Sequence, residues 1–374
     1  MRTDHRMMPA SIAPLAFAEL RFTLRKAKWA PCETARHVWA ELGSAAPSRI
    51  LLRTAAVLIF AAAGTSAAAP PKLEKVSDHF YYFRAEGEAV NTGVLVTDDG
   101  ILLVDPPGET GNVAFLEALR RVSSKPVRWV VHTDFHQEQA GGAAYFTRSG
   151  ASVFHSKDLR RLSASAPKPE TQGASADRRE AKAAKVEETH KEAGARWTFG
   201  RQMRLFPGGI EVRVFAVQHK AHTGGDVVVY VPAEKVLQTG DLFTPGSLPQ
   251  IDSAGGEGSA SGWIDGLKQV IDAVPLLKPA IVQPRVEAVK KPAEEKTLEE
   301  LFVVIPGHGP QSNMQEMKDL LESAVRLRSE MARAIAAGRG RESVLVSPAM
   351  NPYRTLNNFE SFAPLLFDAL PKGK

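Results

Sequence analysis

Short apolar runs rich in Val and Ile recur along the chain, and polar residues end most of them. The runs that predict strands lie within residues 76–104 and at 129–132, 151–154, 210–217, 226–231, 236–239 and 302–305. Inside the first range, Asp98, Asp99 and Gly100 separate two apolar runs, which predicts a hairpin. β-Branched runs of this length are typical of buried strands. The pattern therefore predicts a protein built around β-sheet.

Helical spacing is present in three places. Residues 109–122 predict a helix laid on a sheet, with apolar side chains at Val113, Leu116, Leu119 and Val122. A short helix is expected after Gly141 and Gly142, and residues 317–336 predict a long amphipathic helix. The tail that follows is expected to pack back onto the body through Phe359, Phe362, Leu365, Leu366 and Leu370.

Two charged segments interrupt the apolar pattern. Residues 157–205 contain twelve basic and seven acidic side chains, with few large apolar ones before Trp197. This composition favours an exposed insertion, and a helix folded over a site entrance is the alternative. Residues 278–298 form a second charged insertion ahead of the strand at 302–305.

Charge is distributed unevenly, which changes the interpretation of the net charge of +5. Residues 1–68 hold nine Lys and Arg against four Asp and Glu, so they account for the whole excess. The rest of the chain is balanced and offers no basic surface of the kind that binds nucleic acid. A nucleic-acid partner is therefore not expected.

The leader has the pattern of an export signal. Arg49 and Arg53 precede a short apolar stretch, and Ser66, Ala67 and Ala68 follow as a small-residue cleavage site. We interpret residues 1–68 as a leader with a signal peptide, with an uncleaved anchor or a buried helix as alternatives. A periplasmic or secreted location follows, with membrane contact only through an uncleaved leader. Residues 1–47 are long for the start of a signal peptide, and a misassigned translation start would explain them.

The mature protein, residues 69–374, would contain no thiol, because the single cysteine of the chain is Cys32. A disulfide, a zinc ribbon and a cysteine nucleophile are therefore excluded for it. Any metal ion would have to be held by histidine and carboxylate.

Three separated strings place such residues directly after apolar runs: VVHTDFHQEQAGG from Val130, AHTGGDVVVYVPAEKVLQTGDLF from Ala221, and VVIPGHGP from Val303. Their order resembles that of the metallo-β-lactamase superfamily over about residues 76–321. The resemblance implies an α/β (α+β) fold, a four-layer αββα sandwich with the metal centre at one edge of the two sheets. The domain predicted for residues 69–374 then carries the charged insertions at about 157–205 and 278–298, and the apolar spacing adds a C-terminal helical extension at about 315–374.

The first motif departs from the family pattern T-H-x-H-x-D-H. The same frame here begins at Thr133 and reads T-D-F-H-Q-E-Q, so that Asp134, Glu138 and Gln139 replace three of the four usual ligands. The later positions match and are His222, Asp241 and His308.

By this resemblance, a first ion would be held by Asp134, His136 and His222. A second ion would be held by Glu138, Gln139 and His308, with Asp241 available to bridge. The second site is expected to be weak or empty, because an amide is a poor zinc ligand. The expected cofactor is one or two Zn²⁺ ions, and a set of two histidines and a carboxylate is also compatible with iron.

Several roles stay open at this level. Asp134 is either a ligand or an acceptor for a neighbouring imidazole, and Glu138 is a ligand, a general base or a solvated loop residue. Asp241 is a ligand or a helix cap. Asp105 either supports a metal histidine or forms a turn. Structural roles are expected for Gln139, His132, His155 and His219.

The resulting prediction is an exported metallo-hydrolase that activates water for attack on an ester, thioester, lactone or amide. Glu138 and Asp241 are its expected catalytic residues. Two alternatives remain: a catalytically impaired protein that keeps the fold for binding, and a mononuclear iron oxygenase on the same scaffold. The expected partner is a small-molecule substrate, and the sequence does not indicate the oligomeric state.

Overall fold

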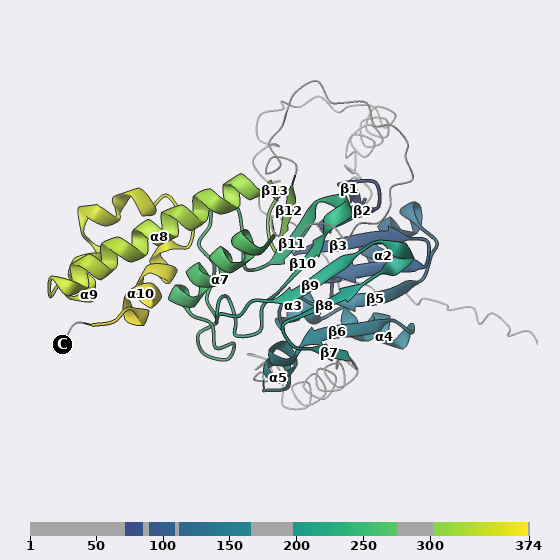
Figure 1. Ribbon diagram of the computed structural model, residues 1–374, viewed down its shortest axis with the longest axis horizontal. Helices are drawn as coiled ribbons and strands as arrows, with labels where there is room; N and C mark the ends of the chain where they lie inside the picture. Colours follow the sequence, from purple (N-terminus) through teal and green to yellow (C-terminus); the bar gives the residue numbers. More distant parts are fainter. Residues whose placement is uncertain (1–71, 85–89, 109–111, 166–196, 275–301, 373–374) are drawn as a thin grey trace, which may run out of the picture. The chain divides into compact units, whose positions relative to one another are not determined.

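Two β-sheets form the centre of the fold (Figure 1). The computed structural model describes residues 72–84, 90–108, 112–165, 197–274 and 302–372. The first sheet contains, in spatial order, β1 (Glu74–Lys75), β2 (Phe80–Arg84), β3 (Asn91–Thr97), β4 (Gly100–Val104), β5 (Val127–Val131), β6 (Ser152–Ser156) and β7 (Trp197–Phe199). The second contains β13 (Ser312–Asn313), β12 (Val303–Pro306), β11 (Val236–Gly240), β10 (Val227–Val231), β9 (Val212–Ala216) and β8 (Gln202–Leu205).

Strand direction divides the first sheet into two halves. Strands β1 to β4 pair antiparallel, and the predicted hairpin joins β3 to β4 with Thr97 opposite Gly100. Strands β4 to β7 pair in parallel, so the loops that leave β4, β5 and β6 emerge at the same edge. In the second sheet only β11 and β12 are parallel neighbours.

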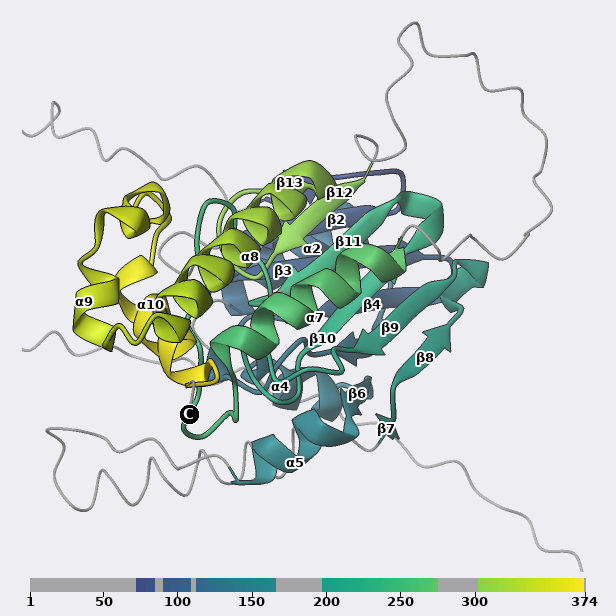
Figure 2. The ribbon, with the colours of Figure 1, turned by 60° about the vertical axis from the view of Figure 1, so that its left-hand side comes forward.

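Three apolar clusters show how the layers pack. One lies between the sheets and joins β4 residues such as Leu102 to β9 and β10 residues such as Val214 and Val229. The other two lie on the outer faces, where helices cover the sheets. β10 is buried on both faces, because Val229 points to the first sheet and Val228 to the helices. The predicted αββα sandwich is confirmed (Figure 2).

On the first sheet the outer layer contains α2 (Asn112–Val122) and α4 (Ala143–Arg148). The predicted helix over 109–122 is present for its described residues, but the prediction of which side chains it buries was wrong in part. Val113 is 76% exposed, whereas Phe115 and Ala118 are fully buried. The helix is rotated toward Phe115 because this ring fits between Phe83 and Phe146 in edge contacts.

On the second sheet the outer layer contains α7 (Ala260–Ala273), α8 (Met314–Ala336) and α10 (Phe359–Ala369), with α9 (Arg341–Leu345) and η5 (Pro348–Tyr353) between the last two. Asn313 caps α8 by accepting a hydrogen bond from the Glu316 amide. The expected packing of the tail is confirmed, because Phe362 is fully buried and meets the Trp263 ring edge-on at 5.4 Å. α7 was not among the helices predicted from the apolar spacing.

The first charged segment is only in part an exposed insertion. Its beginning forms α5 (Lys157–Ser165), which buries Leu159 and Leu162, and its end forms β7 and β8. The prediction of an exposed insertion over the whole of 157–205 was therefore wrong at both ends. At the start of the segment, Leu159 and Leu162 supply an apolar face that a count of charges does not reveal.

Residues 166–196, the segment 278–298 and the leader at 1–68 lie outside the described residues. Among the helices described, none has the length and apolar composition to cross a membrane.

Candidate metal centre

Loops from both sheets meet at one edge of the sandwich. The loop after β5 carries Asp134 and His136, and the loop between β9 and β10 carries His222. Asp241 follows β11 directly. Asp134 lies three residues after the end of β5, whereas His222 lies in the middle of its loop, six residues after the end of β9. The fold thus brings together residues that the sequence separates by about a hundred positions.

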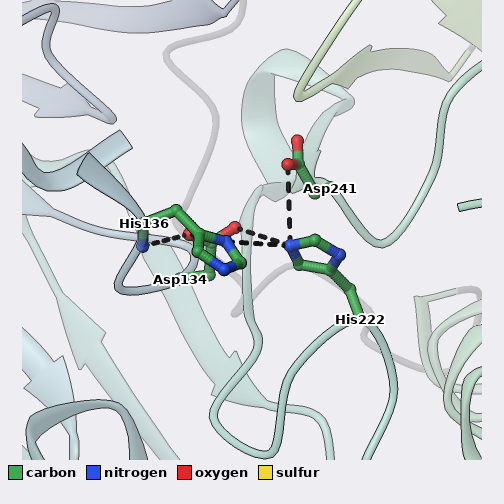
Figure 3. A group of neighbouring side chains, drawn as sticks. All are labelled: Asp134, His136, His222 and Asp241. Carbon is green, nitrogen blue, oxygen red and sulfur yellow. Dashed lines mark hydrogen bonds and ion pairs between the residues drawn. The ribbon is translucent and has the colours of Figure 1, made fainter. Parts of the chain in front are cut away.

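Four side chains converge at this edge (Figure 3). Their potential ligand atoms lie within 4.8 Å of one another. His222 Nε2 lies 3.1 Å from His136 Nδ1, 3.7 Å from Asp134 Oδ2 and 3.6 Å from Asp241 Oδ2. Asp134 and His222 are buried, with 1% and 5% of their surfaces exposed.

These distances fit a single metal ion. Four ligands at about 2.0–2.2 Å from a tetrahedral centre are about 3.4 Å apart, which is close to the spacings of this cluster. Asp134 Oδ2 is buried and has no hydrogen-bond partner among the described residues, as expected of an oxygen reserved for a cation. Two imidazoles with carboxylates are a donor set that Zn²⁺ accepts.

Each imidazole is oriented by an acceptor on its far side. His222 Nδ1 lies 2.5 Å from the Gln250 carbonyl oxygen, and His136 Nε2 lies 3.1 Å from Asp252 Oδ2. A carbonyl can only accept, so Nδ1 of His222 carries the proton and Nε2 keeps its lone pair. The same reasoning leaves the lone pair of a neutral His136 on Nδ1. Metal-binding histidines in proteins have this arrangement.

The two facing lone pairs would repel each other unless a proton or a cation lies between them. The carboxylates around the two rings add to this attraction for positive charge, as the pKa values of the cluster show. Burial lowers the pKa of His136, but the Asp134 hydrogen bond and charge outweigh it and raise the value to about 10. Burial likewise opposes ionisation of Asp241, yet His308 and His222 hold the pKa of its carboxyl below the usual range. The cluster is strongly attractive to positive charge.

Neighbouring groups fix the loops that carry the ligands. Asp105, at φ 51°, accepts hydrogen bonds from the Thr133 amide at 2.8 Å and from its hydroxyl at 2.7 Å. It therefore holds the residue before Asp134 rather than a histidine of the cluster. Gly240, at φ 53°, leaves room for Thr133, whose Oγ1 would lie 2.1 Å from a Cβ at that position.

The four gathered residues include the whole of the first expected ligand set. Asp134, His136 and His222 lie together as proposed for the first ion, and Asp241 lies beside them, as a bridging ligand also would. His308 lies beside the cluster, with Nε2 3.1 Å from Asp241 Oδ1. Within the part of the chain that the structure describes, no second group of three ligands is assembled.

The two remaining positions of the first motif differ in their surroundings. Glu138 is exposed and lines the cavity in front of the cluster, together with His308. Gln139 is fully buried, and its side-chain amide lies beside Asp241, where it helps to lower the pKa of that carboxyl. Whether Glu138 is a ligand or a base stays a prediction.

The three histidines for which structural roles were expected lie outside the cluster. His219 is exposed. His132 and His155 form a buried pair with Nδ1 and Nε2 2.9 Å apart, and burial lowers the pKa of His155 to about 4. Both rings are therefore neutral, in keeping with a structural role.

A cavity of about 420 Å³ opens in front of the cluster. Part of its wall is the loop between β11 and α7, which includes Gln250 and Asp252. Asn358, just before α10, also lines it. Sequence reasoning missed both Asp252 and Asn358, because neither lies in a motif or a periodic segment.

With this geometry in view, comparison with known proteins defines the class. The sequence profile of the metallo-β-lactamase superfamily matches residues 85–308, more than half of the chain. The chain belongs to this superfamily. Relatives in it bind metal ions, commonly zinc, and include hydrolases such as β-lactamases and sulfatases.

Three relatives illustrate the similarity. The metallo-β-lactamase type 2 of Elizabethkingia meningoseptica is 26% identical over 206 residues, which cover 53% of this chain and 72% of the relative. A metallo-β-lactamase structure from Pontibacter korlensis is 19% identical, with a TM-score of 0.48 over 68% of this chain and 99% of that one. A sec-alkyl sulfatase structure is 14% identical, with a TM-score of 0.55 over 79% of this chain and 49% of that one, and shows the fold alone.

Proposed function

We propose that the chain is an exported metallo-hydrolase with one tightly bound metal ion, held by Asp134, His136, His222 and Asp241. One observation carries this proposal: four ligand atoms converge, and the other nitrogen of each imidazole contacts an acceptor that orients the ring. Zn²⁺ is the ion that best fits the donor set, and iron is compatible with it. The substrate class is an ester, thioester, lactone or amide.

A metal ion at this position would polarise the substrate carbonyl and lower the pKa of a water molecule. Glu138 lies on the cavity wall, where its carboxylate can accept the proton that the attacking water loses. Asp252 and the Gln250 carbonyl hold the two imidazoles in one orientation. His308, paired with Asp241, faces the same cavity and can donate a proton to the leaving group.

The second candidate function is binding without turnover. Gln139 favours it, because this buried amide occupies a position at which the family carries a metal ligand. A chain of this kind would keep one structural ion and the cavity, but would lack the second ion.

Metal analysis of protein purified without added metal, followed by a substrate panel, tests the proposal. We expect about one zinc per chain and turnover of at least one ester, thioester, lactone or amide that a chelator abolishes. One bound ion without metal-dependent turnover across the panel favours the binding protein. One iron per chain with oxygen consumption supports an oxygenase instead.

Export is tested separately. Mass spectrometry of the mature protein should find an N-terminus near Ala69 and no peptide containing Cys32. A full-length product that stays in the cytoplasm contradicts the signal-peptide interpretation.

A further inference from the structure

The segment before α10 forms a short pairing with the cavity wall. The Leu248 amide donates to the Asn357 carbonyl at 3.0 Å, and the Asn357 amide donates to the Gly246 carbonyl at 3.1 Å. Ser247 and Asn357 are bridged in parallel fashion. Asn357 lies beyond residue 308, where the match to the superfamily profile ends.

Asn358 adds a side-chain clamp to this pairing. Its Nδ2 donates to Ser247 Oγ at 3.1 Å and to the Leu248 carbonyl at 3.0 Å. Its backbone is left-handed, with φ 63° and ψ 12°, a conformation that Asn tolerates better than most residues. The turn directs the side chain at the loop and lets α10 start immediately afterwards.

The clamped loop continues directly to the groups that orient the imidazoles. Gln250 and Asp252 follow Leu248 by two and four residues, and they contact His222 and His136. At the far end, the Asp252 amide donates to the His222 carbonyl at 3.0 Å. The segment from Ser247 to Asp252 is thus fixed at one end by the C-terminal extension and at the other by the loop that carries a ligand.

We propose that Asn358 is a positioning residue of the metal centre, and that the C-terminal extension sets metal affinity and shapes the substrate cavity through the loop at 246–252. The inference rests on the proposed metal centre and not on hydrolysis. Groups that orient metal ligands typically change metal affinity by about 10- to 100-fold when removed. Asn358 contacts the loop that carries Gln250 and Asp252 and does not contact a ligand itself. We therefore expect a change near the lower end of this range.

The Asn358→Gly variant tests this directly. Glycine adopts the left-handed conformation without strain, so the backbone pairing is kept while the clamp is lost. We expect Zn²⁺ affinity, measured by competition with a chromophoric chelator, to fall about tenfold. Asn351→Gly is the matched control, because Asn351 is an exposed residue of the same extension and does not line the cavity. It should bind Zn²⁺ as the natural protein does.

A coupling measurement separates positioning from general stabilisation. In an Asp252→Asn background one of the two orienting contacts is already weakened. The fold-loss of Zn²⁺ affinity caused by Asn358→Gly should therefore be smaller there than in the natural protein, by a factor of about two or more. A lower melting temperature of metal-free Asn358→Gly with unchanged Zn²⁺ affinity would overturn the inference. If the affinities change as expected but the protein turns over no substrate, the role of Asn358 is supported and the hydrolase proposal is contradicted.

Discussion

His136 Nε2 and Asp252 Oδ2 lie 3.1 Å apart, although 116 residues separate them in the chain. The contact directs Nδ1 of the imidazole toward His222 and Asp134. Asp252 is itself held by the Gly255 amide, which donates to Oδ1 at 3.0 Å. A residue of an irregular loop therefore decides which nitrogen of His136 can bind a metal.

Asp252→Asn should weaken Zn²⁺ binding about tenfold, because the amide keeps the shape of the carboxylate but removes its charge from the His136 contact. Chelator competition measures the change. Asp272→Asn, in which the altered side chain pairs with Lys268 on the exposed face of α7, is the control. Equal affinities of the two variants would show that Asp252 does not orient His136.

His222→Ala should remove most of the bound metal, since Nε2 of this ring lies near all three other ligands. Elemental analysis of the purified variant gives the metal content per chain. His219→Ala changes an exposed histidine three residues away and should retain the natural metal content. A full complement of metal in His222→Ala would refute the ligand assignment.

Glu138→Gln should reduce turnover by about 10²- to 10⁴-fold while leaving bound metal near one ion per chain. The reason is that Glu138 lines the cavity but lies outside the four-ligand cluster. Metal content and kcat are both measured on the same preparation. Loss of metal together with activity would identify Glu138 as a ligand instead of a base.

Rebuilding the first motif should create a second metal position. Asp134→His, Glu138→Asp and Gln139→His together supply two imidazoles and a shorter carboxylate beside Asp241 and His308. We expect the triple variant to bind about two zinc ions per chain, compared with about one in the natural protein, because an amide at position 139 contributes little. Two tightly held ions in the natural protein would contradict this expectation.

Stability should depend on pH through His155. Its pKa is about 4 in the folded protein, compared with 6.5 for a solvated histidine, so the unfolded chain binds the proton first as pH falls. The contribution is complete above pH 6.5 and is lost as pH falls toward 4, by roughly 3 kcal/mol in total. Urea unfolding at several pH values should show this loss, and His155→Gln should flatten the slope in part, because burial also lowers the pKa of its partner His132. Parallel slopes in both proteins would rule out this origin.

Much of the fold was predictable because β-branched runs mark strands that are buried on both faces. Val228 and Val229 of β10 contact opposite layers, so the run had to be apolar throughout. α7 also carries a usable signal, since Ser259 caps it and Trp263, Leu267 and Val270 recur at helical spacing. The face of α2 was harder to predict, because Phe115 competes with Val113 for the core.

The site was predictable only where a ligand stands at a position of the superfamily's motifs. His136, His222 and Asp241 stand at such positions and carry the expected residue type. Asp252 and Asn358 act through loop conformations that no periodicity encodes, and their partners lie far away in the sequence. The grouping of Asp241 with the first ligand set likewise depends on how the two sheets dock.

The ligand cluster spans the interface between the sheets, since Asp134 and His136 follow a strand of the first sheet and His222 and Asp241 belong to loops of the second. An ion bound there would act as a cross-link between segments about a hundred residues apart, closing a long loop of the chain. Its binding free energy would add to the folding free energy only when both halves are assembled. Loss of the ion would then lower the free energy of unfolding of the assembled domain as well as remove the chemistry that the ion supplies.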